Sequence, residues 1–140
     1  MPEAAKAHTK AGAKAFVTYF WQVVNYAQAT GDTDSIEELT DPACAGCGTG
    51  IKAIEDVYER GDRLVGGEAT VGRTTAVIYP VSEDLVARVT VRISFDRSSH
   101  VRADGSTAEK APAGTVTDEF HLRAIGTDPY WLVVEFGAVK

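Results

Sequence analysis

The stretch that decides the fold is FVTYFWQVVNYA, residues 16–27, which lies in a segment without proline that runs from Glu3 to Thr30. Gly31 follows, and glycine is the residue that most often ends a helix in the left-handed conformation. The sequence therefore predicts one long helix over residues 3–30. Residues 16–27 are apolar on nearly every face of that helix, and a helix that is hydrophobic all round has to be enclosed. We expect the later strands to wrap around it.

Two shorter helices are predicted between residues 32 and 60. The first runs to Leu39 and can be capped by Asp32 or Asp34, because carboxylates accept hydrogen bonds from the free N–H groups of a first helical turn. The second opens at Asp41-Pro42, the pattern of a cap followed by a first-turn proline, and runs to about Arg60. Its expected buried stripe consists of Ile51, Ile54, Val57 and Tyr58.

From Leu64 onward the hydrophobic period changes to two, which is typical of strands with one face in the core. The clearest alternation covers residues 85–96, and further strands are expected over 73–79, with a start as early as residues 68–71, over 115–125 and over 130–139. Residues 97–114 are polar and too long for an ordinary hairpin loop. Either the flanking strands extend into this segment, with a tight turn at Asp104-Gly105, or it is mobile.

These patterns predict a single α+β domain over residues 1–140, in which a long N-terminal helix and two shorter helices pack against a curved antiparallel sheet of about four strands. The net charge is -6 and no basic stripe is present, which argues against nucleic-acid binding. No apolar run approaches the roughly 18 residues of a membrane span. The opening Met1-Pro2-Glu3 fits either a native start or a chain trimmed of a targeting segment.

The most specific local feature is the pair Cys44 and Cys47, the two cysteines of the chain. A local disulfide that fixes the start of the third helix is the leading interpretation, and a redox dithiol at a helix N-terminus is the alternative. A structural zinc would need two more ligands, but His8, His100 and His121 lack ligand spacing. We therefore expect no metal and no cofactor.

Polar residues in apolar settings mark a candidate pocket between helix and sheet. Asn25 lies in the enclosed part of the first helix, and Asp118 is in phase with the inward residues of its strand. The functional hypothesis is a ligand pocket in which the Asp118 carboxylate is available for proton transfer. The alternative is a satisfied core amide and a carboxylate near a strand end. The candidate lining residues are Tyr19, Trp21, Asn25, Tyr26 and Asp118.

His121 alternates with Glu119 and Arg123, which places it on the outer face of the sheet. We interpret it as part of a cross-strand charge ladder and not as a catalytic base. No constellation of residues typical of a known catalytic mechanism appears elsewhere in the chain.

The chain contains a set of short motifs at residues 11–16, 19–21, 25–27, 30–32, 41–47, Gly61 and Gly66-Gly67. Together they resemble the motifs of a family of uncharacterised actinobacterial predicted lipoproteins. The resemblance implies an export signal, a lipidated cysteine and a linker before this domain, and hence an extracytoplasmic protein whose lipid anchor lies outside this chain. The order of helices and strands is also similar to the cone-shaped nuclear-transport-factor-2-like fold, which hosts isomerases, dehydratases and binding modules.

The leading functional hypothesis is a non-enzymatic envelope domain that binds a small apolar molecule or an envelope protein through the mouth of the cone or the outer sheet face. One alternative is a small isomerase or hydratase that uses Asp118 as base with Tyr19 or Tyr26 as donor. A second alternative is a thiol-redox protein that uses Cys44 and Cys47. Folds of this type often pair through the outer sheet face, so a homodimer of that kind is left open.

Overall fold

The computed structural model describes residues 1–126 and 130–139. The helical elements come first and all strands follow them, which confirms the predicted α+β class. The helical elements are the 3-10 helix η1 (Glu3–Lys6), α1 (Lys10–Thr30), α2 (Asp34–Glu38) and α3 (Ala45–Glu59). The strands are β1 (Arg63–Gly66), β2 (Ala69–Val81), β3 (Asp84–Phe95), β4 (Ser98–Val101), β5 (Thr107–Ala111), β6 (Gly114–Ala124) and β7 (Trp131–Ala138).

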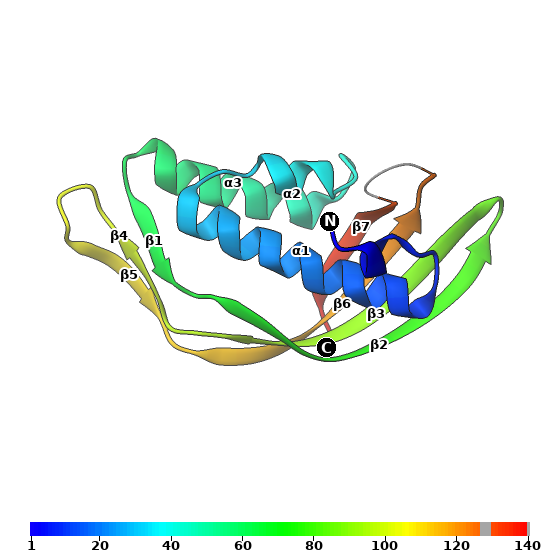
Figure 1. The fold of residues 1–140 in the computed structure, drawn as a ribbon. Helices are drawn as coiled ribbons and strands as arrows, with labels where there is room; N and C mark the ends of the chain where they lie inside the picture. Colours follow the sequence, from blue (N-terminus) through cyan, green and yellow to red (C-terminus); the bar gives the residue numbers. More distant parts are fainter. Residues whose placement is uncertain (127–129, 140) are drawn as a thin grey trace.

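The strands form two antiparallel sheets, a larger one of order β2-β3-β6-β7 and a smaller one of order β1-β4-β5. The chain runs from one sheet into the other three times, between β1 and β2, β3 and β4, and β5 and β6. Gly66 and Gly67 make the first of these junctions with φ of 73° and 74°, values that favour glycine. The Gly67 N–H donates to the carbonyl of Arg97 across the second junction. The two sheets therefore form one bent surface (Figure 1).

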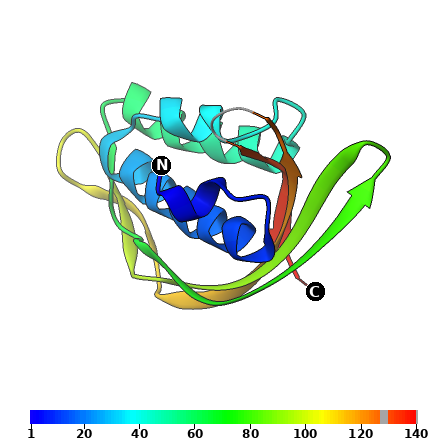
Figure 2. The same ribbon diagram turned by 45° about the vertical axis from the view of Figure 1, so that its right-hand side comes forward.

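Helix α1 lies in the concave side of this surface, with α3 on the side of α1 away from β2 and β3 and in contact with β7 (Figures 1 and 2). Phe16 and Val17 are fully buried, as the all-round apolar pattern of residues 16–27 predicts. The rings of Phe20, Phe120 and Phe136 pack on one another, with centroid separations between 5.1 and 6.2 Å. The enclosure expected from the sequence is therefore confirmed for most of the helix.

The long helix begins later than predicted. Residues 3–6 form the separate turn η1, and α1 starts only at Lys10, with Thr9 as its cap: the Thr9 hydroxyl accepts a hydrogen bond from the Gly12 N–H at 3.0 Å. The chain turns here because Gly12 lets the Ala7 carbonyl approach, since a Cβ at Gly12 would lie 1.8 Å from that oxygen. The indole of Trp131 donates to the same carbonyl at 3.0 Å. A tertiary contact thus overrides local helix propensity.

The third helix also begins later than predicted, at Ala45 instead of next to Pro42. The Asp41 carboxylate accepts from the Ala43 N–H at 2.8 Å, but this bond closes a turn and not a helix. The backbone of Asp41 is engaged by β7, because its N–H donates to the carbonyl of Val133 at 2.9 Å. The predicted stripe holds for Ile51, Ile54 and Val57, which are buried, and Tyr58 is half-buried.

The polar segment 97–114 forms strands β4 and β5, which build the small sheet with β1. The turn between them follows the predicted position, with φ of 89° at Gly105 and the Asp104 carboxylate accepting from the Ser106 N–H at 2.8 Å. The predicted sheet of about four strands therefore corresponds to the large sheet alone. Of the two alternatives for residues 97–114, the one with strands on both sides of a turn at Asp104-Gly105 is therefore correct. A separate small sheet was not predicted, because β5 is mostly exposed on both faces and lacks hydrophobic alternation.

Candidate binding groove

A groove of about 600 Å³ lies between α3 and the small sheet. Its walls come from elements that are distant in sequence, and most of its lining is apolar. The apolar lining residues include Phe20, Trp21, Val24, Ile36, Ile51, Ile54, Val57, Leu64, Phe95 and Phe136. A concave, mainly apolar site with a few polar groups is the usual form of a small-ligand site.

One wall is a single face of α3. Cys47, Ile51 and Ile54 follow at intervals of four and three residues, which places them on one side of a helix. Gly50 lies on the same wall, and a Cβ built on it meets no atom within 4 Å. The groove is therefore open in front of α3 because Gly50 carries no side chain.

The opposite wall consists of β4 and β5, and Asp62 holds these strands in place. One carboxylate oxygen of Asp62 lies 2.8 Å from His100 Nε2, and the other accepts from the Ala103 N–H at 3.1 Å. The hydrogen bond from His100 is the main cause that lowers the pKa of Asp62. Because Asp62 follows directly after α3, it fixes the distance between the end of that helix and the β4–β5 hairpin.

The base of the groove is aromatic. The Trp21 ring lies 5.7 Å from Phe95 and 6.2 Å from Phe120, measured between centroids, in edge arrangements. Trp21 is 7% exposed, and its Nε1 has no hydrogen-bond acceptor among residues 1–126 and 130–139. A buried N–H group without a partner is costly, so the packing beneath the groove retains an unsatisfied donor.

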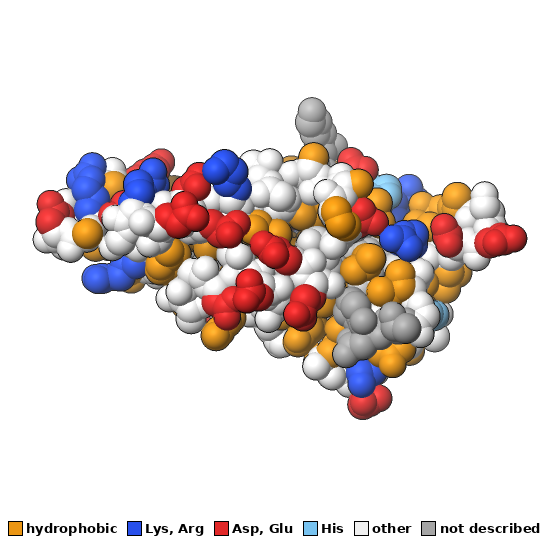
Figure 3. All heavy atoms as spheres, turned by 90° about the horizontal axis from the view of Figure 1, so that it is seen from above, with side chains coloured by type: hydrophobic (Ala, Val, Ile, Leu, Met, Phe, Trp, Pro, Cys, Tyr) orange, Lys and Arg blue, Asp and Glu red, His pale blue; other side chains and the backbone are white. Residues whose placement is uncertain are grey.

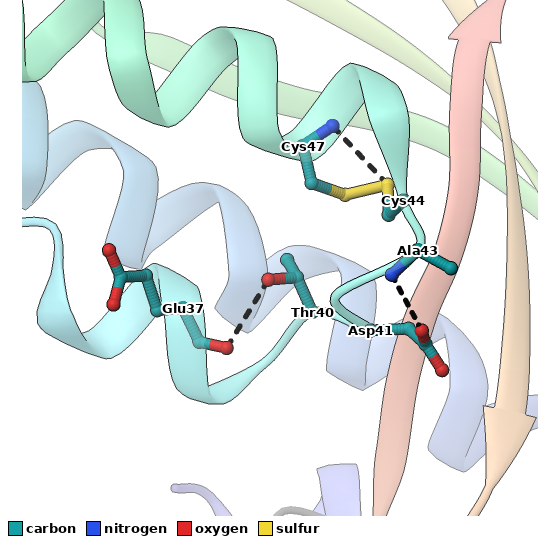
Figure 4. Close-up of a disulfide and its surroundings, with 6 residues drawn as sticks. All are labelled: Glu37, Thr40, Asp41, Ala43, Cys44 and Cys47. Atoms are coloured by element: carbon teal, nitrogen blue, oxygen red, sulfur yellow. Dashed lines mark hydrogen bonds between the residues drawn. A yellow bond between two sulfur atoms is a disulfide. The ribbon is translucent and has the colours of Figure 1, made fainter.

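The predicted disulfide is confirmed. Cys44 and Cys47 are bonded, and both are almost fully buried. Figure 4 shows the bond at the first turn of α3, where the Cys47 N–H also donates to Cys44 Sγ at 3.3 Å. Cys44 is thus the cap of α3 and Cys47 the first residue of its groove wall. The burial of both sulfur atoms gives no support to the redox hypothesis, which favours an exposed thiol.

The five predicted pocket residues do not converge on one site. Trp21 lines the groove, whereas Tyr26 is 52% exposed on the other side of α1 and faces solvent. Tyr19 is half-buried against the core. The side-chain amide of Asn25 forms two hydrogen bonds with the backbone of Ala69, which fits the interpretation of Asn25 as a satisfied core amide.

Asp118 lies on the inward face of β6 and is 8% exposed. Burial raises the pKa of its carboxyl group. Within the part of the chain that the structure describes, no side-chain hydrogen bond or ion pair joins the Asp118 carboxylate to Tyr19, to Tyr26 or to any other residue. Its suggested role as a base stays a prediction.

Sequence reasoning found the α3 wall only as a core stripe and missed the β4–β5 wall. The sequence feature that could have revealed the α3 wall as part of a groove is Gly50, which interrupts an otherwise apolar helix face. On the outer sheet face, His121 Nε2 lies 2.8 Å from Glu119 of the same strand. His121 stands opposite Arg88 of β3 and Glu135 of β7 in the strand register, and the cross-strand charge ladder stays a prediction. No group of three or more His, Cys, Asp or Glu side chains within residues 1–126 and 130–139 could hold a metal ion.

The fold and the groove define this protein as an α+β domain with a helix-walled apolar groove beside a bent antiparallel sheet. The chain belongs to DUF6318, a family of unknown function, whose profile matches residues 1–136. No curated protein matches the chain. Across the described residues, no helix has the length and apolarity needed to cross a membrane.

Two solved structures share the fold at low identity. The intermembrane space region of the chloroplast protein ARC6 is 9% identical, with a TM-score of 0.63 over 94% of this chain and 96% of that one. The protein Aln2 from a Streptomyces species is 10% identical, with a TM-score of 0.53 over 91% of this chain and 90% of that one. At these identities the likeness concerns the fold alone.

Proposed function

We propose that this domain is a non-enzymatic binding module of the cell envelope that receives an apolar group in the groove between α3 and the small sheet. The observation that carries the proposal is the groove itself, about 600 Å³ in volume and lined mainly by apolar side chains. Burial of apolar surface contributes roughly 25 cal/mol per Å². An apolar occupant would therefore gain free energy by covering these side chains.

The cell-envelope part of the proposal is supported by the disulfide between Cys44 and Cys47, since such bonds persist mainly in oxidising compartments. It is also supported by the resemblance of residues 41–47 and other motifs to predicted lipoproteins. In this proposal a lipid anchor that precedes the domain tethers it outside the cytoplasmic membrane. The helix α1 cradled by a bent sheet supports a cone-shaped, nuclear-transport-factor-2-like fold as part of the same proposal.

Binding is preferred to catalysis because, among the described residues, no hydrogen bond joins the candidate base Asp118 to either candidate donor, Tyr19 or Tyr26. Asp118 is buried on β6, while Tyr26 faces solvent. Acid–base catalysis requires groups within hydrogen-bond reach of one another or of a shared substrate.

The proposal is tested by titrating the protein with the uncharged fluorophore N-phenyl-1-naphthylamine. We expect saturable fluorescence enhancement with the wild-type protein. Gly50→Phe places a ring in the open space before α3 and should weaken binding by roughly tenfold or more, about 1.4 kcal/mol. Gly48→Phe is the matched control, because Gly48 also has no atom within 4 Å of a built Cβ but does not line the groove. Equal binding by both variants would refute the proposed site.

A further inference from the structure

The sheet has an open edge beside the groove. Strand β5 is the last strand of the small sheet, with β4 as its one neighbour among the described residues. In the large sheet, the pairing of β7 with β6 ends at Asp118 and Ala138. One further hydrogen bond follows, from the Val139 N–H to the Thr117 carbonyl. Residues 107–116 therefore have no strand on their outer side within the described part of the chain. Such an edge presents unpaired N–H and C=O groups.

The open edge and the groove are parts of one surface. Glu109, Lys110 and Ala111 of β5 line the groove from one side, and Phe136 of β7 lines it from the other. A strand added to the open edge of β5 would therefore border the groove. Val116 is in phase with the buried inward residues of β6 but is 40% exposed. The inward face of the sheet is thus left uncovered at this point.

The helical layer beside the groove is mainly acidic, whereas the charged or titratable side chains that line the groove itself are His100, Glu109 and Lys110. Residues 31–59, which include α2 and the whole α3 wall, carry eight acidic residues and one basic residue, Lys52. Lys52 is already paired with Asp56 at 3.2 Å. Figure 3 looks down on this helical layer and shows acidic side chains gathered over it. On the inward face of β6, Asp118 adds a buried carboxylate that has no cationic partner among residues 1–126 and 130–139.

These observations point to one class of occupant. We infer that the groove binds an extended peptide segment of a partner protein, which pairs as an added strand with the edge formed by residues 107–116. Its apolar side chains at alternate positions enter the groove, and the basic side chains between them lie on the opposite face of the added strand, where the net charge of -6 on the domain attracts them. This inference rests on the proposed function, because it assigns the occupant of the same groove. A small molecule could fill the groove but could not satisfy the open backbone edge.

The test uses the peptide Ac-KVKLKVKLK-NH2 with the whole domain. We expect saturable binding and slower hydrogen exchange of amides within residues 107–116. The acidic analogue Ac-EVELEVELE-NH2 should bind at least roughly tenfold more weakly, because the domain carries a net charge of -6 and repels it. Gly50→Phe should lower the affinity for the basic peptide, and Gly48→Phe should not.

Backbone pairing is tested with two N-methylated forms of the basic peptide. One is methylated at its Lys residues and the other at its Val and Leu residues. Alternate N–H groups of a strand point to opposite edges, so one form should lose binding and the other should keep it. Equal binding of the two forms, or no binding of the basic peptide to a protein that binds N-phenyl-1-naphthylamine, would overturn the inference and leave the proposed function intact. Failure to bind either probe would refute both.

Discussion

The side chain of Asn25 and the backbone of Ala69 form a closed pair of hydrogen bonds: Asn25 Nδ2 donates to the Ala69 carbonyl at 2.9 Å, and the Ala69 N–H donates to Asn25 Oδ1 at 2.8 Å. The pair joins the C-terminal half of α1 to the first residue of β2, directly after the bend at Gly66 and Gly67. It therefore fixes where the sheet begins to wrap around the helix.

Replacement of Asn25 by alanine should lower the free energy of unfolding by about 2 kcal/mol, because two backbone groups lose their partner. The measurement is urea denaturation followed by circular dichroism. Gln22→Ala is the matched control, since Gln22 is exposed on the same helix and makes no such bonds to the described residues. Equal stability of the two variants would show that the pair does not hold the bend.

Replacement of glycine by alanine should have opposite effects on stability at residues 12 and 48. Gly12→Ala should destabilise the protein by at least about 2 kcal/mol, because its Cβ would lie 1.8 Å from the Ala7 carbonyl oxygen. Gly48→Ala should stabilise it by about 0.5–1 kcal/mol through helix propensity, because nothing lies within 4 Å of that Cβ. Thermal denaturation of both variants checks the prediction, and a tolerated alanine at residue 12 would contradict the turn before α1.

The disulfide should stabilise the start of α3 by a modest amount. Because the loop between Cys44 and Cys47 is short, chain entropy accounts for about 2 kcal/mol. We expect dithiothreitol to lower the melting temperature of the wild-type protein. The double variant Cys44→Ala and Cys47→Ala should melt at a lower temperature and should not respond to the reductant. A wild-type melting temperature unchanged after complete reduction would contradict this role.

Asp118 should make stability fall as pH rises. Burial raises the pKa of its carboxyl group in the folded state above the ordinary value of 3.8, so the folded protein holds the proton more tightly than the unfolded chain. The stabilisation is fully present below pH 3.8 and is lost as pH rises through the folded-state pKa. Asp118→Asn removes this dependence, so it should be more stable than the wild-type protein at neutral pH, and the difference should shrink as the pH falls through the folded-state pKa towards 3.8. A pH-independent difference in unfolding free energy would contradict the assignment.

The parts of the fold that sequence could predict are those with a strong local pattern. The apolar run 16–27 and the alternation over residues 85–96 led directly to the enclosed helix and to β3, which covers Asp84–Phe95. The late starts of α1 and α3 depend on tertiary contacts, those of Ala7 with Trp131 and of Asp41 with Val133. No local pattern encodes such contacts.

The candidate site was predicted less well than the fold. Trp21 was identified, but Tyr26 lies on the exposed side of α1, because a helix in a cradle still presents one narrow face to solvent. Lys110 and its neighbours on β5 gave no signal, since an exposed edge strand has the polar composition of a loop. The groove exists only because the sheet bends and brings that edge opposite α3.

The most direct test of the groove as a binding site is a two-dimensional NMR titration of the 15N-labelled domain with N-phenyl-1-naphthylamine. We predict that chemical-shift changes concentrate on the amides of Gly50, Ile51, Ser99 and Lys110, which line the two walls. The amide of Thr75, on the edge strand β2, should remain unmoved. Changes centred on Thr75 or on the outer sheet face, with none at the two walls, would contradict the account.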